Sequence, residues 1–498
     1  MHSSCKGTEA LVERLLEGRG VVWLLMAVAA LVGLSFGACT QDDAFITFRY
    51  AEHLVQGHGL VFNIGERVEG YTNLSWTLLM AACMAIGAEP VVASTLLGLG
   101  CLGGVVWATW RLGGGGATGP MLIVAPLLVA LDAQLALESV EGLETAFYVL
   151  LCTLGTTAAI REERWGGAGW FSLACLTRPE GVLMWAVVHL GLGLRDLGRA
   201  ALRERVRATV RSAVPIVLCL MLLTAWRVSY YGDPLPNTFY AKTGGVAVAR
   251  GLQYIWTHVL SHPVLWVLVA ARLSAGALSS RTIPLVVAAG CYLLYVIVIG
   301  GDFKPTGRFV LPVLPMLAVL AQETVAGLVT RGAAWRRAVP LVVLLGIAGT
   351  AVHQVGAMSM HAAERHANLE SRKLVGDWIA SHTHPSAVIA IHSAGVVPYY
   401  AGRATIDMWG LTDRTIARTE MAGMGTGVAG HEKSNPSYVF GRKPDLYLPE
   451  DKIFTLRAWT LQPDSGFPED FSEEYRSVSV PIEGRYLNMW VRRGVEGG

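Results

Sequence analysis

The sequence predicts a polytopic α-helical membrane protein of about 10 to 12 spans, followed by a C-terminal soluble α/β domain. Of its 498 residues, 53% are hydrophobic and only 16% are charged. The mean hydropathy is +0.44, which is unusual for a soluble protein. Apolar runs close to the length of a bilayer span recur from residue 21 to about residue 356. Beyond that point the chain becomes polar, as a folded extramembrane domain would be.

The apolar runs define the expected helices. They are residues 21–38, 74–88, 91–110, 119–137, 143–160, 168–194, 211–229, 260–277, 282–300, 308–330 and 338–356. We expect the first run to be an uncleaved helix, since no small-residue cleavage site clearly follows it. We expect 168–194 to form two short helices that turn at Pro179, because one helix would place Arg178 near the bilayer centre. Three apolar runs lie between residues 74 and 160, but the flanking segments favour an even number of membrane crossings. We therefore expect run 74–88 to lie flat at the outer surface.

The placement of arginines predicts the orientation of these helices. Two loops are rich in arginine and should be cytoplasmic by the positive-inside rule. Their members are Arg195, Arg199, Arg203, Arg205, Arg207 and Arg211 in one loop, and Arg331, Arg336 and Arg337 in the other. Loops 40–73, 230–250 and 300–308 then lie on the outer side, together with all residues after 356. No basic domain indicates a nucleic-acid partner.

The expected domain division follows from these assignments. Residues 1–356 form a transmembrane module with an outer loop at 40–73, and residues 357–498 form an extracytoplasmic α/β domain. Within that domain we expect a helix at 361–381 and strands at 388–391, 445–448 and 486–491. All eight cysteines precede residue 292, so this domain needs no disulfide even outside the cell.

Two adjacent carboxylates, Asp42 and Asp43, follow the first apolar run. Like charges beside lipid are costly, because each ionised group requires water or a partner. Residues 43–55 have helical spacing and can form a helix in the membrane interface. An N-cap role would explain Asp42 alone but not the pair. We therefore interpret Asp42 or Asp43 as a catalytic base.

Three cations are candidates for holding a phosphate. Lys304 and Arg308 flank a glycine-rich turn in the outer loop, and arginine can grip phosphate oxygens with two donors. The alternative is a pair of side chains that snorkel at a helix end. Arg178, at the expected helix break, is a further candidate.

The remaining outer segments supply candidate substrate-binding residues. Loop 230–242 combines aromatic, proline and polar residues, which suits stacking on a sugar or, alternatively, an interfacial aromatic belt. The acids of segment 139–145 fit helix-end solvation about as well as a site. The candidates are Glu69, Tyr71, Glu144, Glu180, Tyr231, Asn237, Lys242 and Asp302. No cofactor is identified, and a divalent cation stays open; His382 and His384 are spaced like ligands, but a solvated loop fits them better.

Acids and cations on one side of a membrane protein fit sugar transfer from a polyprenyl phosphate. The phosphodiester is a stable leaving group, the acceptor hydroxyl needs a base, and the departing phosphate needs positive charge. A transporter or flippase for such lipids would instead place charges at the midplane of repeated halves. A non-catalytic envelope or flagellar assembly factor is a third hypothesis, which would tolerate loss of the two aspartates.

The same segments resemble a known family. The motifs are DDAFITFRYAEHLVQGHGLVFNIGERVEGYTNLSW, EGLET, LTRPEG, YYGDPLPNTFYAK, GGDFKPTGRF, and DMWGLTDRTIAR followed by GHEK. In this order, from about residue 40 to 435, they resemble the terminal β-(1→2)-arabinofuranosyltransferase family, part of the GT-C superfamily of membrane glycosyltransferases.

The resemblance implies a GT-C-like fold, a polyprenyl-phosphate sugar donor, a glycan or lipid acceptor of the cell envelope, and inversion at the transferred sugar, possibly arabinofuranose. It implies a bacterial inner (plasma) membrane location with the acidic loop outside. Asp42 and Asp43 match the acidic pair, while Arg178, Lys304 and Arg308 match charged positions. Two residues depart from the pattern: Glu141, where a small residue is expected, and Lys304, where an apolar one is common.

Overall fold

The structure is a computed structural model that describes most of the chain. The described residues are 19–37, 39–114, 123–163, 165–198, 201–242, 247–276, 278–304, 307–421, 424, 427–428, 430–450, 452–463 and 466–494. Arg199, Pro305 and Thr306, which belong to segments singled out in the sequence, lie outside them.

The chain divides into two compact units, each built from separated segments. The first contains residues 1–38, 94–222 and 246–362, and the second contains residues 39–93, 223–245 and 363–498. The second unit is therefore larger than the expected C-terminal domain, because it also includes the acidic loop 40–73 and loop 230–242.

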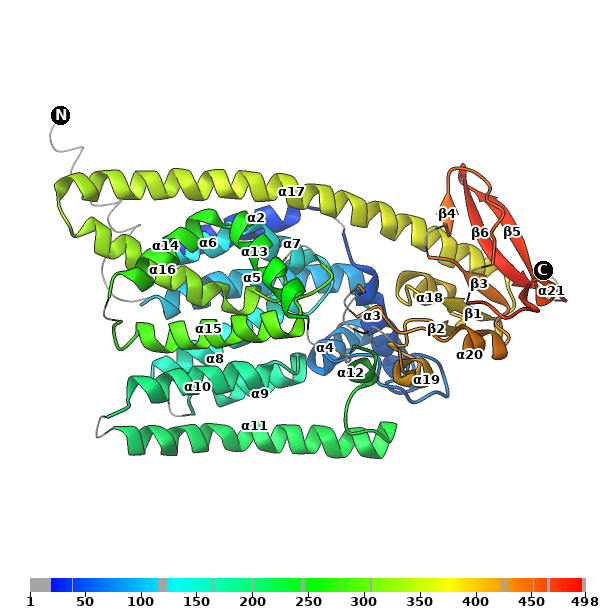
Figure 1. The fold of residues 1–498 in the computed structure, drawn as a ribbon, viewed down its shortest axis with the longest axis horizontal. Helices are drawn as coiled ribbons and strands as arrows, with labels where there is room; N and C mark the ends of the chain where they lie inside the picture. The colour runs from blue at the N-terminus through cyan, green and yellow to red at the C-terminus, as the bar shows by residue number, and fades with distance from the viewer. Residues whose placement is uncertain are drawn as a thin grey trace. The chain divides into compact units, whose positions relative to one another are not determined.

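The first unit is helical (Figure 1). Its helices are α2 (Arg19–Leu34), α5 (Pro90–Leu112), α6 (Val124–Ala130), α7 (Ala133–Val140), α8 (Thr145–Ile160), α9 (Ala168–Thr177), α10 (Gly181–Arg195), α11 (Leu202–Tyr231), α13 (Val248–Ser261), α14 (Pro263–Ser274), α15 (Thr282–Ile299), η2 (Leu311–Val313), α16 (Leu314–Val329) and α17 (Ala333–His382). Helices α5, α11 and α17 also contribute residues to the second unit.

Among the described residues, five helices are long and apolar enough to cross a membrane, or seven spans if two bent helix pairs count as one span each. The bent pairs are α7 with α8 and α13 with α14, and four shorter apolar helices accompany them. A multi-pass α-helical membrane protein is confirmed. The number of 10 to 12 spans stays a prediction.

The expected break in run 168–194 is present. Helix α9 ends at Thr177, α10 begins at Gly181, and the two helices pack against each other (Figure 1). Arg178 has an extended backbone, as expected for a residue that precedes proline. Gly181 allows the tight approach, since a Cβ there would lie 2.5 Å from the backbone nitrogen of Cys175.

The expected helices at 338–356 and 361–381 are instead one helix. α17 continues for 50 residues from Ala333 to His382, with Pro340 inside it. The polar residues after 356 do not interrupt the helix, because residues 357–375 are mostly good helix formers and include no glycine or proline.

The second unit combines short helices with one mixed sheet. The helices are α3 (Asp42–Val55), α4 (Leu74–Ala85), α12 (Asn237–Lys242), α18 (Val396–Ala401), α19 (Arg414–Arg418), α20 (Pro436–Gly441) and α21 (Phe471–Glu474). The strands are β1 (Val388–Ile391), β2 (Ala404–Asp407), β3 (Leu446–Leu448), β4 (Phe454–Thr455), β5 (Tyr475–Ile482) and β6 (Arg485–Arg492). The three expected strands and the expected helix at 43–55 are confirmed as β1, β3, β6 and α3.

The sheet order is β2-β1-β3-β6-β4, with β5 paired to β6 as well. β1 is parallel to β2 and β3, whereas β6 is antiparallel to β3, β4 and β5. An apolar cluster that includes Val375 of α17, Ile389 of β1 and Leu487 of β6 covers part of the sheet. A second cluster includes Ile406, Phe440 and Trp490. Edge strand β2 is the part of the sheet that meets the acidic loop 40–73, as described below.

Candidate active site

Asp42 is the first residue of α3, and its carboxylate is fully engaged by residues late in the chain. Its Oδ2 accepts a hydrogen bond from the backbone N–H of Gly395 at 3.0 Å, and its Oδ1 accepts one from Val396 at 2.9 Å. The guanidinium of Arg372 lies 2.9 Å from Oδ1. Asp42 therefore does cap a helix, but the capped helix is α18 and not its own helix α3.

Asp43 differs from Asp42 in the contacts of its carboxylate. It occupies the first turn of α3 and is half-buried. Within the ranges that the structure describes, no hydrogen bond or ion pair engages its side chain. Of the two candidate bases, Asp43 is thus the one that can accept a proton without breaking an existing interaction.

Glu69 and Tyr71, candidate substrate ligands, are internal structural residues in this conformation. Both oxygens of Glu69 contact Arg227 at 2.8 to 3.0 Å, and the Glu69 side chain is only 2% exposed. Burial raises the pKa of Glu69, and the bonds from Arg227 oppose that shift. The Tyr71 hydroxyl lies 3.2 Å from that of Tyr231, which donates to the Leu60 carbonyl. Burial raises the pKa of Tyr71 well above its ordinary value.

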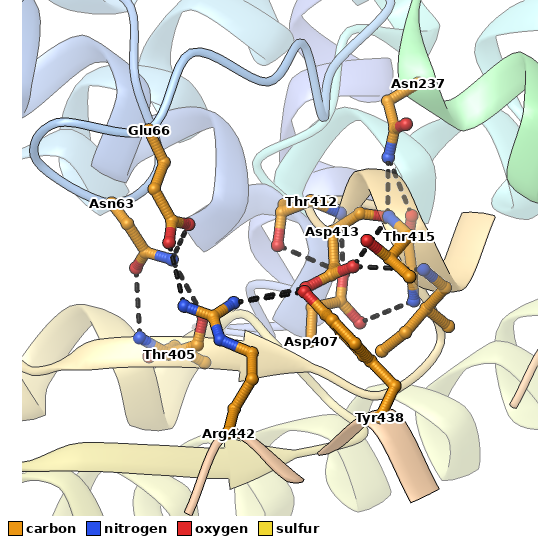
Figure 2. Close-up of polar contacts among 12 residues, drawn as sticks. Asn63, Glu66, Asn237, Thr405, Asp407, Thr412, Asp413, Thr415, Tyr438 and Arg442 are labelled. Atoms are coloured by element: carbon orange, nitrogen blue, oxygen red, sulfur yellow. Dashed lines mark hydrogen bonds and ion pairs between the residues drawn. The ribbon is translucent and has the colours of Figure 1, made fainter. Parts of the chain in front are cut away.

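Asn237 connects loop 230–242 to the segment after β2 (Figure 2). Its side-chain amide donates to the carbonyls of Gly410, Leu411 and Asp413 at 2.8 to 3.1 Å. These bonds make Asn237 an organiser of the loop rather than an open substrate ligand. Lys242, at the end of α12, is exposed.

The acidic loop 40–73 also covers the edge of the sheet. Asn63 donates to the Thr405 carbonyl and accepts from its backbone N–H, at 2.8 and 3.0 Å, so its amide imitates a neighbouring strand on β2 (Figure 2). Three residues further on, Glu66 pairs with Arg442 at 2.9 Å, and Arg442 also lies 3.5 Å from Asp413.

In the first unit, Lys304 is paired with two acids. Its Nζ lies 3.3 Å from both oxygens of Glu138 and 2.7 Å from Glu141, and all three side chains are buried. The two residues that depart from the family resemblance, Glu141 and Lys304, thus contact each other. With two carboxylates on one ammonium, Lys304 is a structural partner rather than an available phosphate ligand.

Arg178 and the candidate ligands Glu144 and Glu180 form one buried group. Arg178 lies 3.2 Å from Glu144 and 3.5 Å from Glu180, beside the rings of Tyr148 and Phe309. Two carboxylates thus share one guanidinium, so the charge of Arg178 is compensated within the group.

Arg308 keeps more donors available than the other two cations. One Nη contacts Asp302 at 2.8 Å, and Nε is buried without a hydrogen-bond partner among the described residues. Arg308 is also within electrostatic range of Arg178 and Glu138. Of the three cations, Arg308 is therefore the one with a buried donor left for a further acceptor.

The charged residues of the groups around Lys304, Arg178 and Arg308 can be compared as a set. The acids are Glu138, Glu141, Glu144, Glu180 and Asp302, and the cations are Arg178, Lys304 and Arg308. Carboxylates outnumber cations by two, which suits sugar hydroxyl donors better than a purely cationic phosphate site would.

No group of three or more His, Cys, Asp or Glu side chains within the described ranges has the geometry of a metal site. The rings of His382 and His384 bind neighbouring groups, the Trp378 carbonyl and the Ser386 hydroxyl respectively. His382 is the last residue of α17 and His384 lies in the segment after it, and both residues are exposed.

The sequence did not reveal four residues that organise both regions: Arg49, Arg227, Arg372 and Glu138. Arg227 lies within an apolar run and Glu138 directly follows one, and a charge in such a place is costly and should have drawn attention. Arg49 and Arg372 lie on helices among other polar residues and carried no such signal.

Comparison with known proteins agrees with this architecture. Residues 351–489 match a protein family described as a domain of unknown function (DUF8728). The chain is 26% identical over 363 residues to a terminal β-(1→2)-arabinofuranosyltransferase of Corynebacterium glutamicum, which covers 61% of this chain and 50% of that protein. The enzyme of the same name from Mycobacterium tuberculosis is 28% identical over 289 residues, covering 50% of this chain and 44% of that protein. The chain spans about half the length of these curated relatives.

Solved structures give the fold. ArnT from Cupriavidus metallidurans bound to undecaprenyl phosphate has a TM-score of 0.60 at 14% identity and covers 97% of this chain and 100% of its own. The archaeal oligosaccharyltransferase AglB from Archaeoglobus fulgidus, in complex with an inhibitory peptide and a dolichol-phosphate, has a TM-score of 0.55 at 10% identity and covers 78% and 64%. The sequence and fold comparisons together confirm the resemblance: this chain has the fold of the GT-C membrane glycosyltransferases and is similar in sequence to the terminal β-(1→2)-arabinofuranosyltransferases.

Proposed function

We propose that the protein is an inverting glycosyltransferase of the bacterial inner membrane. It transfers a sugar from a polyprenyl-phosphate donor to a glycan or lipid of the cell envelope, on the extracytoplasmic side. The sequence relatives favour arabinofuranose as the sugar. The observation that carries the proposal is the difference between the two adjacent aspartates. Three donors hold the Asp42 carboxylate, whereas no hydrogen bond or ion pair among the described residues engages that of Asp43.

The chemistry is a single displacement. The acceptor hydroxyl oxygen bonds to the anomeric carbon as the bond from that carbon to the phosphate oxygen breaks. The electron pair leaves with the polyprenyl phosphate, and the hydroxyl proton passes to the Asp43 carboxylate. The departing phosphate needs positive charge, and Arg308 of the first unit, whose Nε has no hydrogen-bond partner among the described residues, is a separate candidate for that role. The surplus of carboxylates around it binds sugar hydroxyl groups.

Matched substitutions of the two aspartates test this function. Asp43→Asn should lower the transfer rate by about 10²- to 10⁴-fold, the usual contribution of a general base. Asp42→Asn keeps one acceptor oxygen for the α18 amides and should retain clearly more activity than Asp43→Asn. Purified protein in liposomes is assayed with labelled polyprenyl-phosphate pentose and hexose donors, and the anomeric configuration of the product is read by NMR.

The alternatives make different predictions in the same assay. A flippase would move labelled lipid across the bilayer without forming a new glycosidic bond. A non-catalytic factor would still support envelope or flagellar assembly after both aspartates are replaced. Full transfer by the Asp43→Asn protein would exclude this residue as the base, and retention of configuration would exclude a single displacement.

A further inference from the structure

We propose that the C-terminal domain, meaning the described residues from 363 to 494, is a clamp that positions the catalytic base. It holds the first turn of α3 through Asp42 and thereby orients Asp43. The proposal rests on the proposed function of Asp43. It assigns a role to the segment that matches a domain of unknown function.

Arg372 is the central residue of the clamp. One of its nitrogens contacts Asp42 Oδ1 at 2.9 Å, and another contacts Glu450 Oε1 at 2.8 Å. Ser393 donates to the same oxygen of Glu450 at 2.6 Å. Arg372 is therefore itself held on the domain side, so it can fix Asp42 in one orientation rather than follow its motion.

Gly395 allows the backbone of the domain to reach α3. A Cβ at this position would lie 1.9 Å from the carbonyl oxygen of Asp42 and 2.6 Å from its Oδ2. Real Cβ atoms never approach so closely, so no other residue fits without moving one of the two segments. The two N–H groups that hold the carboxylate, from Gly395 and Val396, depend on this approach.

A second anchor lies two turns along α3. Arg49 is 5% exposed and donates to the carbonyls of Pro398 and Arg403 at 2.7 Å each. Burial lowers the pKa of Arg49 to about 10, which leaves it charged at neutral pH. Phe45, between the two anchors, packs against the ring of Tyr399 at 5.4 Å. With contacts at both positions, α3 can neither rotate nor slide relative to the domain.

Positional control of this kind has a chemical purpose. Asp43 is one residue from Asp42, so rotation of the first turn would move its carboxylate by an ångström or more. A misplacement of about 1 Å can cost about 10²-fold in rate. The clamp differs from an acceptor-binding role for the domain, which would affect substrate binding rather than the position of the base.

Two variants with matched controls test the clamp. Arg372→Ala removes the ion pair with Asp42, and Arg492→Ala is its control, because it breaks the pair with Asp445 inside the same domain. Gly395→Ala forces α3 and the domain apart, and Gly441→Ala is its control, since nothing lies within 4 Å of the added methyl group there. Arg372→Lys tests rescue by a retained charge.

Kinetics and hydrogen exchange are measured on the full-length protein in liposomes. For Arg372→Ala and Gly395→Ala we expect kcat to fall about 10- to 100-fold with KM for donor and acceptor nearly unchanged. Backbone amides of residues 42–55 should exchange faster, while those of β1 and β6 should not. Arg372→Lys should recover part of kcat, and both controls should behave as the wild type.

The outcomes separate the clamp from the proposed function. Wild-type kcat in Arg372→Ala and Gly395→Ala would overturn the clamp while leaving the transferase intact. A raised acceptor KM with unchanged kcat would also overturn it, in favour of acceptor binding by the domain. If the wild-type protein transfers no sugar, the proposed function fails, and the exchange of residues 42–55 still decides whether the domain holds α3.

Discussion

Asp407, at the end of β2, shows how one buried carboxylate can organise a turn. It is fully buried and accepts from the backbone N–H groups of Trp409 and Gly410 on one oxygen, and from Thr412 on the other (Figure 2). Burial raises the pKa of Asp407 from 3.8 to about 6, and the donated hydrogen bonds only partly oppose this shift. The group therefore couples folding to pH.

The sign of that coupling gives a prediction for Asp407. The folded protein holds this proton more tightly than the unfolded chain, so the stabilisation is complete below about pH 4 and is lost as the pH rises to about 6. Its size is roughly 2 to 3 kcal/mol. In detergent, the thermal midpoint of the wild type relative to Asp407→Asn should fall between pH 4 and 6 and stay constant above pH 7. Parallel curves for the two proteins would show that Asp407 has an ordinary pKa.

At the scale of the residue, the sequence identified which groups were chemically important more successfully than what they do. Asp42, Glu69, Lys304 and Asn237, which the sequence suggested as catalytic or ligand-binding residues, are all engaged by other parts of the protein. Their partners are distant in sequence, so local pattern could not distinguish a residue that binds substrate from one that is already satisfied.

Among the elements, helices α9 and α10 depend on a close contact at their turn. The Cβ position of Gly181 lies 2.5 Å from the backbone of Cys175. We expect Gly181→Ala to destabilise the protein by about 1 to 3 kcal/mol, because an extra methyl group must separate the two helices. Thermal unfolding in detergent measures the change.

Gly193, in the same helix α10, provides the control. Nothing lies within 4 Å of a Cβ added there, so Gly193→Ala should be neutral or slightly stabilising through helix propensity. Equal effects of the two substitutions would mean that α9 and α10 do not pack as described. This contrast tests the helix break itself. Pro179 indicates the break from the sequence, and the extended backbone of Arg178 shows it in the structure.

Elements with strong local signals were predictable, and those without them were not. Strands β1, β3 and β6 are apolar and β-branched or aromatic, and α3 has helical spacing. β5, with its alternating small polar residues and a proline, has a weak strand signal and is held by its full-length pairing with β6. The continuity of α17 across residue 357 was missed because a change in composition is not a break in a helix.

For the whole molecule, the main feature is that one compact unit is assembled from three separated segments. Residues 39–93, 223–245 and 363–498 share a single contact-defined unit. One of its apolar clusters draws Tyr50 from the first segment, Tyr231 from the second and Leu411 from the third. Such a unit forms only when residues that are far apart in the sequence come into contact.

A truncated protein that ends at residue 362 tests this dependence. Because Arg372, Gly395 and Arg403 would be lost, we expect the amides of α3 to exchange at least about tenfold faster than in the full chain. Helix α15, within the first unit, should keep its protection. Hydrogen exchange followed by mass spectrometry reports both. Unchanged protection of α3 would show that the first two segments fold without the third.

The sequence by itself determined the class of this protein, its helical membrane module and the main strands of its C-terminal domain. These follow from composition and short-range periodicity, which act over a few residues. Only the tertiary structure decided which carboxylate is free. The Asp42 carboxylate is bound by groups more than 300 positions away in the sequence. Asp43 is the next residue and has the same side chain, but no such group among the described residues binds it. Satisfaction of a polar group depends on what folding brings within hydrogen-bonding distance, and that information is not local.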